Sequence, residues 1–234
     1  MKIVFDLDYT LLDTVKFKEA LLAATGVSEE EYTAAYDEVV AAHNGLFDPE
    51  KLFTELQRRG LLDDASAEQS KGRFSQVLKE IEKYLYPDAK ELLEVLGTHK
   101  DAIVELMTFG NKEWQQQKVE HSGLRTLFHA VHCVDEEKKN VISKAGEGHD
   151  KVIVVNDNGK EMDEMHDAAP DFVYIFKKGP KPGPTKCGSL AAETMLELAE
   201  RLEEQTGWEL RREMRELREG REEKSESPLP SKNH

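Results

Sequence analysis

The stretch KIVFDLDYTL, residues 2–11, decides the fold of this chain. Its apolar run at 3–5 is too short and too rich in β-branched and aromatic side chains for a helix, so we expect a buried strand. Asp6 and Asp8 follow at the carboxyl end of that strand, where open α/β sheets bind their ligands. Two carboxylates this close repel each other, and Mg²⁺, which prefers oxygen ligands, would relieve the repulsion. The stretch therefore indicates a magnesium site, although Asp-x-Asp alone is also common where a strand ends in a turn.

The composition limits the classes of protein that fit. A net charge of −15 over 234 residues argues against nucleic acid or an anionic membrane as the main partner. Any phosphorylated ligand would need local positive charge or a metal ion. Cys133 and Cys187 form no Cys-x-x-Cys pair, so neither a zinc ribbon nor a disulfide framework is indicated. Because no apolar segment is long enough for a signal peptide or a membrane span, we expect a soluble cytoplasmic protein.

A helical insert is predicted between Asp13 and Pro87. Apolar residues recur there with helical spacing, in segments that begin after cap residues such as Ser28 and Asp48 and end at glycines. None of these segments has the pattern of a strand. Because ordinary α/β connections contain a single helix, we interpret residues 14–86 as a helical cap that forms a lid over the site. The alternative is that these helices belong to the core domain.

The second predicted strand ends in a sequence suited to phosphate. Residues 102–107 are apolar except for Glu105 and lead into Thr108, Gly110 and Asn111, after which a polar helix begins. The Thr108 hydroxyl could donate a hydrogen bond, Gly110 allows close approach of the backbone, and free N–H groups at the helix start would point at the anion. The alternative is an ordinary strand–turn–helix connection, in which Thr and Asn are common caps.

Two adjacent lysines follow the third predicted strand, residues 130–134. Lys138 and Lys139 head the next helix, and either could neutralise charge shared by the aspartates and a phosphate. We favour Lys138, because Val141 and Ile142 follow it at helical spacing and place it near the packed face.

A second acidic cluster follows the very apolar strand at 152–155. Asp157, Asn158 and Glu161 stand at its carboxyl end, with Asp163 as a competitor to Glu161. A cation bound by Asp6 requires such a partner from another strand.

These segments predict an α/β fold with a Rossmann-like parallel sheet covered by helices on both faces. The expected strands are 3–5, 102–107, 130–134, 152–155 and 172–176. The predicted organisation is a core domain (1–13 and 87–203), the helical cap (14–86), a charged C-terminal helix (204–224) and a disordered tail (225–234). The charged helix is either a solvated extension or a surface for a partner, which would include a second copy in an oligomer.

Together these motifs resemble the haloacid dehalogenase-like (HAD) hydrolase superfamily, with its C1 cap at the position of the insert. The resemblance covers residues 2–13 and 87–176. Its four motifs are filled, in order, by Asp6, Asp8 and Thr10; by Thr108; by Lys138 or Lys139; and by Asp157 and Glu161. Three positions depart from the usual pattern: Tyr9, where glycine is frequent, Asn156, where Gly or Asp is usual, and Glu161, where Asp is usual.

The resemblance implies a chemistry for these residues. Asp6 would attack phosphorus and form an aspartyl-phosphate, and Asp8 would act first as general acid and then as general base. Mg²⁺ would be held by Asp6, the carbonyl of Asp8 and Asp157. Thr108, Gly110 and the lysine would hold the phosphoryl oxygens, with lesser parts for Thr10, Asn111, Asn158 and Glu161.

A carboxyl group at Asp8 further implies a phosphatase, because the dehalogenases of this fold lack it and a departing halide needs no proton. The resemblance thus predicts a Mg²⁺-dependent hydrolase for a small phosphate monoester. Two alternatives stay open from the sequence: a phosphomutase or other phosphotransferase, and a catalytically silent binding protein on the same fold.

Overall fold

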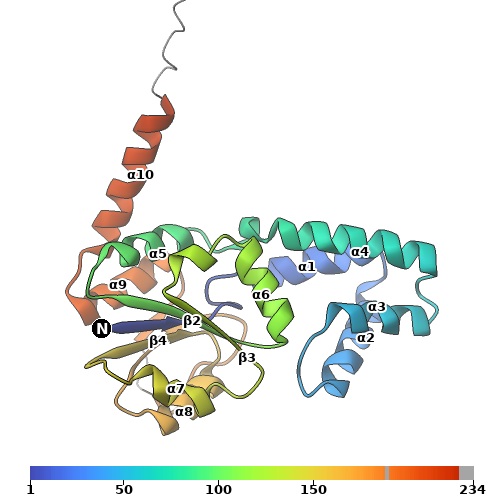
Figure 1. Cartoon of the computed structure of the whole chain (residues 1–234), viewed down its shortest axis with the longest axis horizontal. Helices are drawn as coiled ribbons and strands as arrows, with labels where there is room; N and C mark the ends of the chain where they lie inside the picture. The colour runs from blue at the N-terminus through green and yellow to red at the C-terminus, as the bar shows by residue number, and fades with distance from the viewer. Residues whose placement is uncertain (188–189, 227–234) are drawn as a thin grey trace, which may run out of the picture.

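A computed structural model describes residues 1–187 and 190–226 of the chain. Within this part, six strands form one fully parallel sheet in the order β3-β2-β1-β4-β5-β6 (Figure 1). The strands are β1 (Lys2–Phe5), β2 (Ile103–Phe109), β3 (Ala130–Val134), β4 (Val152–Asn156), β5 (Val173–Lys177) and β6 (Leu190–Ala192). The predicted α/β fold is confirmed, and the short β6 is a strand that the sequence pattern did not predict.

The first strand lies in the middle of the sheet. It pairs with β2 on one side and β4 on the other, and all four of its residues are buried. Ile3 and Phe5 face one apolar core while Val4 faces a second one, as the alternation of side chains along a strand requires. Because the strand order reverses beside β1, a crevice opens at its carboxyl end, next to Asp6.

Helices cover both faces of the sheet. The helices α5 (Ala89–Thr98), α6 (Lys112–His121) and α9 (Met195–Thr206) contribute to the core on the face of Ile3. The helices α7 (Lys139–Ala145) and α8 (Gly159–Ala168) pack on the opposite face, and Figure 1 shows them across the sheet from α5 and α9.

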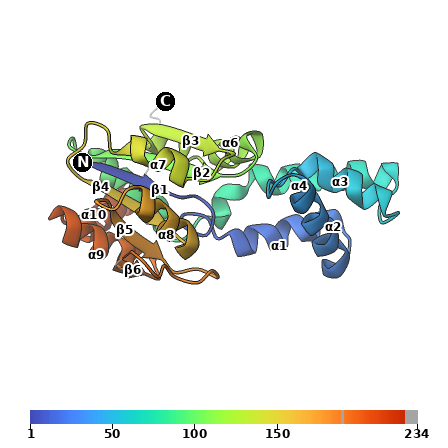
Figure 2. The ribbon, with the colours of Figure 1, turned by 90° about the horizontal axis from the view of Figure 1, so that it is seen from below.

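Four helices form the cap, and both views place them beyond the end of the sheet towards which β1 runs (Figures 1 and 2). They are α1 (Thr14–Thr25), α2 (Glu29–Ala42), α3 (Pro49–Arg58) and α4 (Asp64–Lys79), followed by a short 3₁₀ helix at Ile81–Tyr84. The helix starts agree with the sequence signals: Ser28 and Glu31 form a capping box, and Asp48 caps α3 with proline in its first turn. The predicted helical insert is therefore present as a cap.

The C-terminal helix α10 (Leu210–Glu226) packs on the core domain by its first turns. Leu210 and Met214 are buried there, and Arg218 and Arg221 form ion pairs with acidic side chains of the α5 region. The first two residues of the predicted disordered tail belong to this helix, whereas 227–234 lie outside the described residues. A role of α10 in oligomer formation stays a prediction. No helix in the described part is both long enough and apolar enough to traverse a lipid bilayer.

Candidate active site

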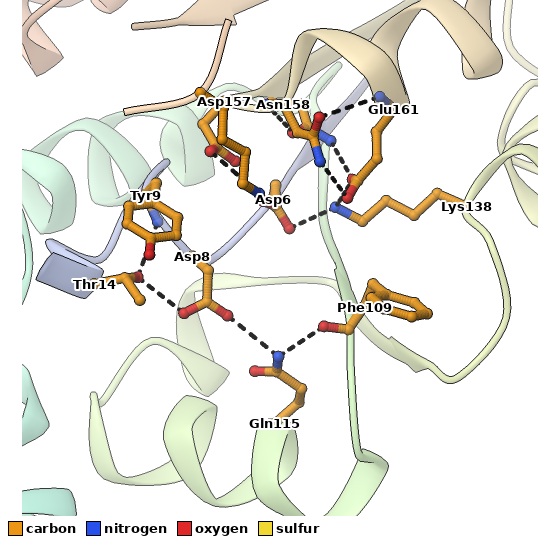
Figure 3. A network of polar contacts seen from close by, with 12 residues as sticks. Asp6, Asp8, Tyr9, Thr14, Phe109, Gln115, Lys138, Asp157, Asn158 and Glu161 are labelled. Atoms are coloured by element: carbon orange, nitrogen blue, oxygen red, sulfur yellow. Dashed lines mark hydrogen bonds and ion pairs between the residues drawn. The ribbon is translucent and has the colours of Figure 1, made fainter. Parts of the chain in front are cut away.

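Asp6 stands at the end of β1 and is 7% exposed. Its Oδ1 accepts a hydrogen bond from Lys138 Nζ at 2.7 Å, and the same ammonium lies 2.9 Å from Glu161 Oε2 (Figure 3). Burial raises the pKa of Asp6 above its ordinary value, and the attraction of Lys138 offsets this only in part. For Glu161, burial would raise the pKa, but Lys138 holds it below its ordinary value. Lys138 thus joins the ends of β1, β3 and β4.

The two lysines after β3 have different surroundings. Lys138 is 5% exposed, as its predicted place near the packed face requires. Lys139 instead pairs with Glu137 at 2.6 Å and with Glu164 at 3.7 Å, away from Asp6. The structure therefore places Lys138, and not Lys139, against the predicted nucleophile.

The carboxylate of Asp8 is turned away from Lys138, towards α6 and α1. Lys118 Nζ lies 2.5 Å and 2.7 Å from its two oxygens, Thr14 Oγ1 donates at 2.9 Å and Gln115 Nε2 donates at 3.2 Å. Burial would raise the pKa of Asp8, yet the charge of Lys118 and the three donors together hold it below its ordinary value. Figure 3 shows Asp8 held between Thr14 and Gln115.

Tyr9, one of the departures from the family pattern, has a backbone conformation that favours glycine. Its φ is +59°, in the left-handed region that few L-residues adopt. The turn lets its amide N–H donate to Thr14 Oγ1 at 3.0 Å, the same hydroxyl that donates to Asp8. The strained turn thus helps to orient Asp8.

Two predicted hydroxyl groups are buried without a hydrogen-bond partner. The Oγ1 atoms of Thr108 and Thr10 belong to residues that are at most 1% exposed, and neither has a partner in the described part. Thr108 lines the same cavity as Asp6, whereas Thr10 does not. An unsatisfied hydroxyl beside two carboxylates is suited to donate to a bound oxyanion.

The turn after Thr108 differs in part from the predicted phosphate cradle. The Gly110 amide N–H donates to the carbonyl of Val134 at 2.9 Å, so it is not available to an anion. Asn111 caps α6, because its side chain accepts from the amide of Trp114. Gly110 has φ +150°, and a Cβ there would lie 2.6 Å from Gln115 Nε2. Glycine is therefore needed here for space beside Gln115.

Asp157 is a buried carboxylate whose negative charge is only partly compensated. It is 1% exposed, and neither carboxylate oxygen has a hydrogen-bond partner. Burial and the nearby charge of Asp6 raise its pKa to about 7, and the ammonium of Lys181, 3.6 Å from Oδ2, offsets this only partly. Two buried carboxylates from neighbouring strands fit the oxygen chemistry of Mg²⁺.

Asp8 would contribute to such a site only by its main chain, because Lys118 engages its side chain. In keeping with this, the described residues hold no cluster of three His, Cys, Asp or Glu side chains suited to a metal. The carboxylates whose chemistry fits Mg²⁺ are thus Asp6 and Asp157, and the main-chain carbonyl of Asp8 stays a predicted third ligand.

The choice between Glu161 and Asp163 is clear from their contacts. Asn156 and Asn158 donate side-chain hydrogen bonds to the two oxygens of Glu161, at 3.2 Å and 2.8 Å, and direct it at Lys138. Asp163 instead accepts backbone N–H bonds from Thr185 and Lys186, away from the cavity. Glu161 therefore belongs to the site and Asp163 anchors a loop.

Sequence reasoning missed Lys118, Gln115, Thr14 and Lys181. The first two lie three residues apart on α6, so they share one face of the helix, and both are buried. Their spacing on one helix face can be read from the sequence, but nothing local in the sequence shows that they are buried or connects them to Asp8.

The comparisons with known proteins agree with this architecture. The sequence model of the haloacid dehalogenase-like hydrolases matches residues 3–173. No curated protein sequence matches the chain. Among solved structures, one described as a haloacid dehalogenase-like hydrolase of Burkholderia xenovorans has a TM-score of 0.65 at 20% identity, covering 86% of this chain and 97% of that one.

Two further structures are similar in fold. The HAD-hydrolase YfnB of Bacillus subtilis, solved bound to magnesium, has a TM-score of 0.58 at 15% identity, with 86% and 97% of the two chains covered. L-2-haloacid dehalogenase of Xanthobacter autotrophicus has a TM-score of 0.52 at 22% identity, covering 75% of this chain and 76% of its own. At these identities the likeness concerns the fold, while the match to the family model spans most of the sequence. The chain belongs to the haloacid dehalogenase-like hydrolase family.

Proposed function

We propose that the protein is a Mg²⁺-dependent phosphatase that hydrolyses a small phosphate monoester through an aspartyl-phosphate on Asp6. One observation carries this choice within the family: a second carboxylate, Asp8, lines the same cavity as Asp6. Hydrolysis of a carbon–halogen bond releases a halide that needs no proton, whereas a departing alkoxide does. The unpartnered Thr108 hydroxyl and the ammonium of Lys138 support an oxyanion ligand at the same place.

The first half of the reaction forms a covalent bond to Asp6. An Oδ atom of Asp6 attacks phosphorus, the bond from phosphorus to the leaving oxygen breaks, and Asp8 transfers a proton to that oxygen. In the free protein Lys118 favours the carboxylate form of Asp8, and the negative charges of a bound phosphate would favour its protonated form. Lys138 and Thr108 would bind the non-bridging oxygens.

The second half returns Asp6 to its starting state. Asp8, now a carboxylate, removes a proton from water as the water oxygen attacks phosphorus, and the bond between phosphorus and Asp6 breaks to release phosphate. Bound Mg²⁺, held by Asp6, Asp157 and the Asp8 carbonyl, would offset the repulsion between phosphate and carboxylate. The same residues would serve a phosphotransferase, in which a hydroxyl replaces water.

The test is release of phosphate from p-nitrophenyl phosphate in the presence of MgCl₂, with release of chloride from 2-chloropropionate measured in parallel. We expect phosphate release by the wild type and loss of at least about 10³-fold in Asp6→Asn, because the nucleophile is removed. Asp163→Asn is the matched control, since this carboxylate lies outside the cavity. Full activity of Asp6→Asn, or chloride release without phosphate release, would contradict the proposal.

A further inference from the structure

The cavity at Asp6 and Asp8 is lined by both charged and aromatic side chains. Its volume is about 180 Å³. Besides Tyr9 and Phe109, which adjoin site residues in the chain, five aromatic residues line it: Phe17, Tyr32, Tyr36, Phe47 and Trp114. Trp114 belongs to the core helix α6 and the others to the cap, so the two domains build this wall together.

The rings form a continuous surface. The centroids of Tyr36 and Phe47 lie 4.9 Å apart with planes inclined by 28°, and the rings of Phe47 and Trp114 meet edge to face with centroids 5.6 Å apart. Phe17 and Tyr32 are buried and hold the cap together, whereas Tyr36 and Phe47 stay partly exposed. A flat apolar group in the cavity could pack against the exposed parts of these rings, edge to face or offset.

The lysines that line the cavity differ in whether a carboxylate lies beside them. Of the four lysines that line the cavity in the described part, three lie beside carboxylates: Lys118 at Asp8, Lys138 at Asp6 and Lys181 at Asp157. Lys18 is exposed and has no carboxylate partner among the described residues, although the chain carries a net charge of −15.

Lys18 is also placed at the aromatic wall. Its Nζ lies 4.9 Å from the ring centroid of Tyr36 and 6.0 Å from that of Tyr9. The Tyr36 ring thus contacts both the Lys18 ammonium and the Phe47 ring. A ligand stacked on this wall would bring its outer substituents near an unmatched positive charge.

We propose that the physiological substrate is a phosphate monoester of a planar ring that bears a second anionic group, with the ring packed against Tyr36, Phe47 and Trp114 and that group at Lys18. This inference rests on the proposed phosphatase function, which it deepens by naming the class of leaving group. Aliphatic and cationic leaving groups would lack one or both of these interactions.

The main test compares matched phosphate esters. The esters of 4-hydroxyphenylacetate and of tyramine have similar phenol leaving groups but carry opposite charges at the far end of the ring, and glycerol 2-phosphate has no ring. We expect the wild type to prefer the carboxylate ester to the amine in kcat/KM by about 5- to 10-fold, since the charge interaction at the cavity mouth is partly solvated. Lys18→Met should abolish this preference.

The control is Lys16→Met on the same helix. Lys16 pairs with Asp13, its side chain is 70% exposed, and it does not line the cavity, so the preference should persist. Tyr36→Leu and Phe47→Leu should raise KM for both ring esters by about 5- to 10-fold, and leave KM for glycerol 2-phosphate unchanged. Circular dichroism and the thermal unfolding midpoint establish that each variant is folded.

Binding separates this inference from the proposed function. The non-hydrolysable phosphonates that correspond to the two ring esters are titrated by calorimetry. If neither ester is hydrolysed but the anionic phosphonate binds more tightly in a way that needs Lys18, the phosphatase proposal fails and the assignment of the pocket stands.

Three results would overturn the inference while leaving the phosphatase intact. One is equal kcat/KM for the two ring esters in the wild type. Another is an equal loss for every substrate in Lys18→Met, which would assign Lys18 to the phosphoryl group. The third is a kcat/KM for glycerol 2-phosphate that equals or exceeds that of the ring esters.

Discussion

Lys118 and Asp8 are 110 positions apart in the chain and form a partly buried ion pair, with Nζ 2.5 Å and 2.7 Å from the two carboxylate oxygens. Lys118 is 3% exposed and comes from the core helix α6. The predicted acid and base of the reaction is therefore held by the core domain, with Thr14 at the start of the cap as a further donor. We infer that Lys118 is a positioning residue for Asp8.

Lys118→Met tests this role. It leaves the Asp8 carboxylate, whose side chain is 23% exposed, without its charged partner, so we expect the free energy of unfolding to fall by about 2 kcal/mol. We also expect kcat to fall more than KM rises, because Asp8 and not substrate binding is affected. Urea unfolding and steady-state kinetics measure the two effects. Lys118→Arg should recover part of kcat, and Lys160→Met, with a side chain 86% exposed, is the neutral control. A variant with a raised KM and unchanged kcat would assign Lys118 to substrate binding instead.

Asp157→Asn tests the predicted metal ligand. Because the carboxylate is buried with no hydrogen-bond partner, its neutralisation should stabilise the metal-free protein, by about 1 kcal/mol. Mg²⁺ should raise the thermal unfolding midpoint of the wild type, since it binds the folded state, but not that of the variant. Differential scanning calorimetry with EDTA and with Mg²⁺ measures both. An equal Mg²⁺ shift in wild type and variant would remove Asp157 from the ligand set.

The lowered pKa of Asp163 predicts that the free energy of unfolding depends on pH. Burial would raise its pKa, but hydrogen bonds from the backbone of Thr185, Lys186 and Cys187 and from the Thr185 hydroxyl lower it from 3.8 to about 2. Because the folded state binds its proton less readily than the unfolded state, the stabilisation is complete above about pH 4 and is lost as the pH falls towards 2. Asp163→Asn should reduce the free energy of unfolding by about 1 kcal/mol at pH 6 and by about half as much at pH 3. An equal loss at both pH values in urea titrations would show that charge is not the cause.

Gly110→Ala tests the close contact beside Asp8. The added Cβ would lie 2.6 Å from Gln115 Nε2, so Gln115 must move and its hydrogen bond to Asp8 is lost. We expect a loss of about 1–2 kcal/mol in the free energy of unfolding, together with a lower kcat. Gly97→Ala in α5 is the matched control, because a Cβ there meets nothing within 4 Å and alanine favours the helix. Equal stabilities of the two variants would show that Gln115 adapts at no cost.

The sequence by itself determined five of the strands, the helices of the insert and the site residues that stand at strand ends. The apolar runs gave five of the strands, the cap residues gave the helix starts of the insert, and Asp6, Asp8 and Asp157 stood at strand ends. These features are local, because burial patterns and caps are written within a few neighbouring residues. The spacing of Val141 and Ile142 was also sufficient to favour Lys138 over Lys139. The short strand β6 carried no such pattern, since three residues paired at the sheet edge give too little periodicity.

Only the tertiary structure decided which charges meet. How the helices dock on the sheet determines that Lys118 contacts Asp8 and that the Gly110 N–H donates to the Val134 carbonyl. It also determines that Glu161 lies in the site whereas Asp163 binds the backbone of a loop. The aromatic wall likewise exists only where the cap meets α6. Sequence spacing fixes the direction of a side chain within its own element, but the partner it reaches is set by strand order and packing across the whole chain.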